Sequence, residues 1–161
     1  MITVADVEQL PLFHRETIPT DYLDIMGHMN VRWYVALYDT AAWKFFESLG
    51  MNETYYRAEQ AGGFALKQFI QYLAEVRVGE TVAIHGRVLG RSAKRVHFML
   101  FMVNQTTHVL ASTFEVLGSH ADMRVRRTSP YPPEIAAKLD AAIAEHNALG
   151  WEAPVCGVIS P

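Results

Sequence analysis

The spacing of apolar residues changes twice along this chain, and each spacing predicts a different kind of element. From residue 31 to residue 49 the apolar side chains recur every three to four positions, the period of a helix, and Gly50 provides a natural stop. Trp33, Ala36 and Leu37 widen the apolar stripe beyond one face. Because a helix that is apolar on most sides is normally buried, we expect residues 31–49 to form a buried central helix.

After Gly63 the period falls to two, which is the spacing of a half-buried strand. Four strands are predicted, at 64–76, 81–89, 95–103 and 108–117. The segments between them are short and rich in turn-forming residues. Consecutive strands with such short connections form an antiparallel meander.

Three further elements complete the predicted order. They are a strand at 13–20, a short helix from 52 to about 62, and an amphipathic helix at 134–149 that follows a group of prolines. We find no repeat and no second domain. We therefore predict one α+β domain over 1–161, with a core at 11–126 and a C-terminal helix and tail at 130–161. Its long central helix is wrapped by a curved antiparallel sheet of about five strands.

A curved sheet of this size leaves open edges and covers its helix incompletely. Pairing two copies of the chain at such an edge is the simplest way to bury the exposed edge and the uncovered side of the helix. We therefore expect a homodimer, or a tetramer built from dimers.

Composition narrows the class of protein. The chain is 50% hydrophobic and 19% charged, which is typical of a globular protein, and its net charge of −3 argues against a nucleic-acid partner. The sequence shows no N-terminal targeting pattern. It also has no apolar run that approaches the ~20 residues needed to span a membrane, so we expect a cytoplasmic protein with no membrane partner. Cys156 is the single cysteine and the seven histidines are scattered, so we expect no metal and no cofactor.

The most informative stretch lies directly before the central helix, from Asp21 to Asn30. It contains two carboxylates, a glycine, a histidine and an asparagine within ten residues. The first N–H groups of a helix have no partner within the helix, and its dipole adds positive potential there. Such a place can stabilise negative charge, so we interpret the stretch as an active-site loop feeding the helix.

The run from Asp24 to Asn30, Asp-Ile-Met-Gly-His-Met-Asn, resembles the motif of the hotdog-fold acyl-CoA thioesterases of the 4-hydroxybenzoyl-CoA thioesterase type. In that family Asp-x-x-Gly-His-x-Asn precedes the central helix. Residues 71–80 are similar to the family's tyrosine, strand and glycine turn. The resemblance covers about residues 11–120 and implies a hotdog fold with acyl-CoA as substrate.

A closer likeness is to the thioesterases that accompany carnitine dehydrogenase. It rests on Leu-Ala-Glu-Val at 73–76, Ser-His-Ala-Asp at 119–122 and the Pro-Pro-led terminal helix near Pro132. This resemblance implies a betainyl- or carnitinyl-type thioester as substrate.

Thioester hydrolysis needs an attacking oxygen, a stabiliser for the developing oxyanion and a dry acyl pocket. Asp24 occupies the position of the family's catalytic carboxylate and could act as nucleophile or general base; otherwise it only caps the helix. Asp21 is expected to hold the loop. His28 orients the thioester or water, or is structural, and Asn30 is either the helix cap or part of the site wall. These three, Asp24, His28 and Asn30, are the predicted catalytic residues.

Other residues are assigned to binding. Gly27 allows a tight turn beside a ligand, and the resemblance places the oxyanion contact at the backbone near Val31. The aromatic residues Trp33 and Tyr34 are core residues by default, and Tyr72, in the middle of a predicted strand, could face either the helix or the pocket. The alternative is that they contact the substrate, and Trp33 in particular would then offer an aromatic ring to a cationic acyl head.

Basic residues gather in two short runs. Arg91, Lys94 and Arg95 form one, and 124–127 contains the other. Each is either solvated surface or a contact for a phosphorylated ligand, and we assign Arg91, Lys94 and Arg95 to the CoA phosphates.

Two functions remain after other classes are set aside. The chain has no Gly-x-Ser-x-Gly elbow, no phosphate loop, no dinucleotide fingerprint and none of the motifs of hotdog dehydratases. The first function is an acyl-CoA thioesterase. The alternative is a non-catalytic acyl-CoA binding module on the same fold, which would have no need of the carboxylate of Asp24.

Overall fold

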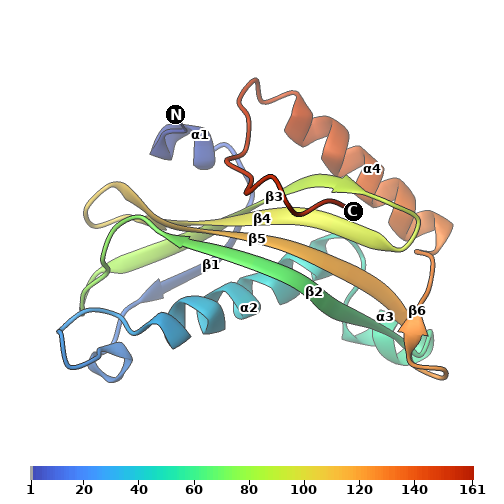
Figure 1. Ribbon diagram of the computed structural model, residues 1–161, viewed down its shortest axis with the longest axis horizontal. Coiled ribbons are helices and arrows are strands. Elements are labelled where there is room, and N and C mark those ends of the chain that lie inside the picture. Colours follow the sequence, from blue (N-terminus) through green and yellow to red (C-terminus); the bar gives the residue numbers. More distant parts are fainter. Residues whose placement is uncertain (1) are drawn as a thin grey trace.

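The computed structural model describes residues 2–161 and has the predicted α+β architecture (Figure 1). The long helix α2, Val31–Ser48, runs along one side of a curved sheet, and the short α1, Val4–Val7, lies on the other side (Figure 1). The helix α4, Pro133–Asn147, packs along the strand Thr81–Arg91 and shares the core of α2 through Ile135 and Leu139. A small helix α3, Glu53–Ala58, and a 3-10 turn at Thr20–Tyr22 complete the helical elements of the described residues.

The sheet is antiparallel throughout. Its strands are β1 Leu12–Thr17, β2 Ala61–Tyr72, β3 Thr81–Arg91, β4 Arg95–Asn104, β5 Val109–Asp122 and the two-residue β6 Arg127–Thr128. Their order across the sheet is β1-β3-β4-β5-β2, with β6 paired to the end of β5. β1 and β2 are therefore the outer strands of the main sheet.

The second predicted strand was placed too far along the chain. β2 begins at Ala61 rather than residue 64, and it ends at Tyr72 rather than residue 76. The chain leaves the ladder because Leu73 and Ala74 both donate their N–H groups to Ala111 O, at 2.8 and 3.1 Å. Alternation of apolar residues continues past this point, so the sequence pattern gave no sign of the departure.

Smaller differences concern the ends of the elements. β5 extends to Asp122, five residues beyond the prediction, and pairs there with β6, which was not predicted. The helix α1 and the 3-10 turn were also missed, and α3 ends at Ala58, earlier than expected. These elements have few residues, and short segments carry too little periodicity to be recognised.

Helix α2 begins where its sequence provides a cap. The Asn30 side-chain oxygen accepts the N–H of Arg32 at 3.1 Å, and after Ser48 the chain reverses at Gly50, whose φ of 90° suits glycine. Tyr34, Leu37, Tyr38, Ala41 and Phe45 are buried at helical spacing.

The other side of α2 is not buried within the chain. Val31, Val35 and Trp43 are 58%, 41% and 58% exposed. The expectation of a helix buried on most sides is therefore wrong for the single chain, because the sheet covers only the face described above.

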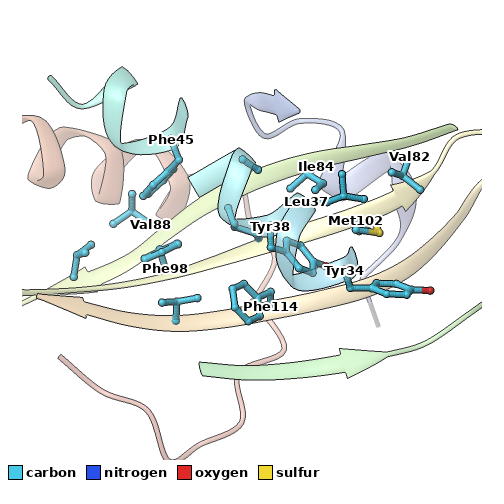
Figure 2. Close-up of a cluster of buried hydrophobic side chains, with 14 of the residues drawn as sticks. Tyr34, Leu37, Tyr38, Phe45, Val82, Ile84, Val88, Phe98, Met102 and Phe114 are labelled. Atoms are coloured by element: carbon cyan, nitrogen blue, oxygen red, sulfur yellow. The ribbon is translucent and has the colours of Figure 1, made fainter. Parts of the chain in front are cut away.

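The main core lies between α2 and the sheet (Figure 2). Tyr38 stacks on Phe114 with ring centroids 4.8 Å apart, and Phe45 stacks on Phe98 at 4.9 Å. A second apolar cluster on the opposite face of β4 contains Met99, Phe101 and Val103 together with α1. Because strand side chains alternate, β4 buries both faces, which explains its nearly continuous apolar sequence.

A buried carboxylate fastens the C-terminal segment to the sheet. Glu115 of β5 is fully buried, and one oxygen lies 2.7 Å from Nε2 of His97 on β4. Its other oxygen accepts the backbone N–H of Cys156 at 2.7 Å. Both oxygens are therefore satisfied, as burial of a charge requires.

None of the helices in residues 2–161 is long and apolar enough to cross a membrane.

We predict that Glu115→Ala lowers the free energy of unfolding by about 3 kcal/mol, because His97 and the Cys156 N–H both lose their buried partner. Urea denaturation followed by circular dichroism measures this. Glu53→Ala is the control, since Glu53 pairs with Arg57 at the exposed surface and should leave stability unchanged. Equal losses in the two variants would contradict the assignment.

Candidate active site

The loop before α2 is closed by its own backbone. Leu23 and Met29 form an isolated antiparallel bridge, and the N–H of Asp24 donates to His28 O at 3.0 Å. Gly27 donates its N–H to Asp24 O at 3.1 Å and has a φ of 86°, so a side chain would strain the turn. The hairpin so formed brings the side chains of Asp24 and His28 together.

Asp24 is held on both carboxylate oxygens. Oδ1 accepts the N–H of Met26 at 2.8 Å, and Oδ2 lies 3.3 Å from Nε2 of His28. The Asp24 side chain is 18% exposed and that of His28 is 33% exposed. The pair is therefore oriented yet open to a ligand, as an active-site carboxylate must be.

A residue that was not predicted also contacts the site. Nδ1 of His28 lies 3.7 Å from Oε2 of Glu75, which follows β2 and also forms an ion pair with Arg77. Glu75 lies far from His28 in the sequence, so spacing alone gave no signal; only the fold brings the two together.

The start of α2 follows directly on this loop. Asn30 acts as the N-cap through Arg32, as one of the two sequence readings proposed. Among the described residues, no hydrogen-bond acceptor faces the N–H of Val31. That N–H is therefore free for a ligand, whereas the N–H of Gly27 is used within the loop.

The three predicted aromatic contacts occupy different environments. Trp33 stacks on Tyr22, with centroids 3.8 Å apart, and is partly buried. Tyr34 is buried, and burial is the main cause that raises its pKa to about 12, which fits the default reading as core. Tyr72 is 46% exposed and meets Tyr34 edge-on at 5.0 Å, so of these three it is the most accessible to a ligand.

One cavity lies along α2 beyond the predicted catalytic residues rather than around them. It has a volume of about 170 Å³ and is lined by residues of α2, α3, β2, β4 and β5. Neither Asp24 nor His28 lines it; its nearest point to the loop is Val35, one helical turn beyond Val31. Sequence reasoning missed this space because its walls come from five separate elements.

The cavity walls are apolar and aromatic. Trp43, Phe46 and Phe64 belong to them, with Asp39 at the exposed side. His120 also lines the cavity, but its ring nitrogens already contact other residues, Tyr55 Oη at 2.7 Å and Ser129 Oγ at 2.9 Å. Burial lowers the pKa of His120, so a neutral ring is favoured there.

The basic residues assigned to CoA do not all remain available. Arg91 forms two hydrogen bonds to Asp140 of α4, at 2.7 and 2.6 Å, and these raise its pKa. Lys94 and Arg95 are exposed on the turn after β3. The loop lies by the opposite end of that strand, roughly 30 Å away. Within one chain, the structure does not bring these residues to Asp24.

No group of three or more His, Cys, Asp or Glu side chains in residues 2–161 is placed to hold a metal ion.

These features agree with the comparison to known families. The family model described as the thioesterase-like superfamily matches residues 18–139, most of the chain. The chain therefore belongs to this superfamily, and its fold is the hotdog fold that the sequence resemblance implied.

Among curated proteins, the chain is 27% identical over 134 residues to the L-carnitine dehydrogenase/betainyl-CoA thioesterase of Agrobacterium fabrum. The match covers 83% of this chain but only 27% of that protein's length. The betainyl-CoA thioesterase of Pseudomonas aeruginosa is 22% identical over 80% of this chain and 81% of its own length.

Among solved structures, a hypothetical protein of Staphylococcus aureus in complex with CoA superposes with a TM-score of 0.80 at 21% identity, covering 91% of this chain and 96% of that one. A 1,4-dihydroxy-2-naphthoyl-CoA thioesterase from Synechocystis superposes with a TM-score of 0.69 at 12% identity, covering 85% of this chain and 98% of its own. Both show the fold.

We predict that Asn30→Ala lowers the free energy of unfolding by about 1 kcal/mol, since the N-terminus of α2 loses its cap. Asn30→Ser restores an N-capping side chain and should recover most of that stability. Thermal and urea denaturation of both variants measure the effect. A serine variant as unstable as the alanine variant would show that Asn30 does more than cap.

Proposed function

We propose that this protein is an acyl-CoA thioesterase, which hydrolyses a thioester to a free acid and CoA. The observation that carries the proposal is the Asp24 carboxylate, oriented beside His28 and next to the free N–H of Val31. Membership of the thioesterase-like superfamily supports it.

The geometry suits attack on a carbonyl whose oxygen lies at the start of α2. The Val31 N–H and the helix dipole stabilise the negative charge that develops on that oxygen. If Asp24 acts as general base, it takes a proton from water as the new C–O bond forms. The tetrahedral intermediate then breaks its C–S bond, and the departing thiolate receives that proton.

A nucleophilic route uses the same carboxylate. Asp24 would then attack the thioester carbon itself, expel the CoA thiolate and form an anhydride, which water hydrolyses to the acid and the free carboxylate. Both routes need Asp24, and His28 contacts it in either case.

The names of the relatives favour a betainyl-CoA or a related short polar acyl-CoA as substrate. Tyr72 and Trp33, near the start of α2, would offer aromatic rings to the quaternary ammonium group, an interaction worth roughly 0.5–2 kcal/mol. The aromatic cavity beyond Val35 favours a second candidate, a larger apolar acyl group, because a betainyl head is too short to extend into it.

We propose a homodimer formed through β2, because such a dimer would bring the basic residues assigned to the CoA phosphates near Asp24. This outer strand has an unpaired edge and carries Leu66, Phe69 and Tyr72, each 39–46% exposed. Two-fold pairing of β2 with its copy would be antiparallel, so the end of β2 nearest Asp24 would meet the beginning of the partner's β2.

The beginning of β2 lies at the same end of the sheet as the basic turn. Phe64 pairs with Ser119, and Ser119 pairs with Arg95. In such a dimer, Lys94 and Arg95 of one copy would approach the Asp24 loop of the other, where phosphates of a bound CoA need a positive partner.

We expect Asp24→Asn to abolish turnover while preserving binding of the CoA ester. Asparagine keeps the size of the side chain and an oxygen for the Met26 N–H, but it cannot attack or take a proton. A positioned base contributes on the order of 10² to 10⁴ in rate. The measurement is steady-state hydrolysis of betainyl, straight-chain and aromatic CoA esters, beside direct binding of the same esters.

Asp21→Asn is the matched control, since Asp21 is exposed in the neighbouring 3-10 turn and should lose little rate. If Asp24→Asn hydrolyses every ester within about threefold of the parent, the catalytic role of Asp24 is wrong. A parent that binds these esters and hydrolyses none would favour the non-catalytic binding module.

The dimer is tested by sedimentation at micromolar concentration. We expect the parent to be dimeric and Phe69→Lys to shift it toward monomer, because a charge on an outer strand opposes pairing. Val78→Lys, at an exposed apolar residue outside β2, should remain dimeric. A parent that is monomeric at these concentrations would refute the arrangement.

A further inference from the structure

Glu75 has no role in the reaction described so far, yet it contacts the site directly. Its Oε2 lies 3.7 Å from Nδ1 of His28, while Nε2 of the same ring lies 3.3 Å from Oδ2 of Asp24. The imidazole of His28 therefore lies between two carboxylates, one at each ring nitrogen.

The backbone that carries Glu75 is fixed on both sides. After β2, the N–H groups of Leu73 and Ala74 are bound to Ala111 O on β5. On the other side, Val76 O accepts the N–H of Met29 at 2.7 Å. Glu75 thus lies between backbone hydrogen bonds to the sheet and a backbone hydrogen bond to the loop that carries His28. These hydrogen bonds hold the Glu75 side chain near His28.

A histidine next to a reacting group needs an orienting partner on its second nitrogen. A neutral imidazole has one N–H and one lone pair, and the group bound at one nitrogen decides what the other presents. With a carboxylate at each ring nitrogen, a neutral ring would turn its lone pair toward one of them, whereas a ring with an N–H at both nitrogens faces each carboxylate with a donor. The charge of Glu75, 3.7 Å from Nδ1, then opposes rotation of the ring. The geometry points to Glu75 as a positioning residue, which holds His28 so that Nε2 stays against the Asp24 carboxylate.

This inference rests on the proposed roles of Asp24 and His28 in thioester hydrolysis. It adds a third residue that does not touch the substrate and acts only through His28. At metal-bound histidines, loss of the orienting partner costs about 10- to 100-fold in metal affinity or activity, and we expect an effect of the same order at His28.

A competing explanation is that the only role of the Glu75 side chain is to form its ion pair with Arg77. That pair is largely exposed, with side-chain exposures of 50% and 64%, and exposed pairs contribute little to stability. The two explanations differ in what Arg77→Gln does. It removes the ion pair while leaving the contact between Glu75 and His28.

The test is a double-mutant cycle on the full chain. Hydrolysis of a CoA ester accepted by the parent is measured for Glu75→Gln, His28→Gln and the double variant, with Arg77→Gln as control. We expect Glu75→Gln to lower kcat about tenfold or more with KM within about twofold. In the His28→Gln background it should cause no further loss, because its effect passes through the missing ring. Arg77→Gln should keep kcat within about threefold of the parent.

Two outcomes would overturn the inference. One is an additive loss in the double variant, which would mean that Glu75 acts independently of His28. The other is an Arg77→Gln variant that loses as much kcat as Glu75→Gln, which would assign the effect to the ion pair.

A second measurement separates this inference from the proposed function. Nitrogen chemical shifts of the His28 ring, recorded by NMR in the resting protein, should change in Glu75→Gln and not in Arg77→Gln, whether or not the chain hydrolyses a thioester. A parent without activity on any CoA ester would refute the thioesterase proposal. Unchanged ring shifts in Glu75→Gln would refute the role of Glu75.

Discussion

The backbone hydrogen bond from Met29 to Val76 joins the two parts of the molecule on which its chemistry depends. Met29 ends the loop that carries Asp24 and His28, and Val76 ends the segment that leaves β2 with Glu75. The same short stretch then starts α2 through the Asn30 cap. One contact therefore fixes the Asp24 carboxylate, His28 and the N-terminus of α2 in a common frame. When the side chains of a site come from two backbone segments, a hydrogen bond between those segments fixes their relative positions more precisely than flexible side chains can.

The sheet around this frame is covered on both faces by its own chain. α2 packs on one face, and α1 and the C-terminal segment after α4 lie on the other (Figure 1), while α4 packs along β3 and adds Ile135 and Leu139 to the α2 cluster. What remains uncovered is the edge of β2 and the side of α2 that carries Val35 and Trp43. Exposed apolar side chains on neighbouring elements are characteristic of association surfaces. In the proposed dimer, self-association and completion of the site would therefore draw on the same region.

Local signals in the sequence predicted much of this. A helical period with an Asn cap and a glycine stop located α2 to within one residue at its end, and period two located β3 and β4 closely. The sequence also placed Asp24 and His28 in one compact motif, and the structure shows that the turn at Gly27 brings their side chains together.

Long-range events could not be predicted in the same way. The departure of the chain after Tyr72 depends on Ala111, and the contact of Glu75 with His28 depends on that departure. Arg91 looked like a free cation in its basic run, yet Asp140 of the terminal helix binds it. In each case the decisive partner comes from another element, and no spacing rule connects the two.

The buried carboxylate of Glu115 has a consequence for the life of the chain. Because it needs the backbone N–H of Cys156, a molecule cleaved ahead of that residue would retain a charge in its interior with one partner fewer. Loss of the C-terminal end would therefore remove a hydrogen-bond partner from the buried Glu115 carboxylate within the sheet. The C-terminal segment is thus part of the core rather than a removable tail, and its loss is expected to lower the stability of the whole domain.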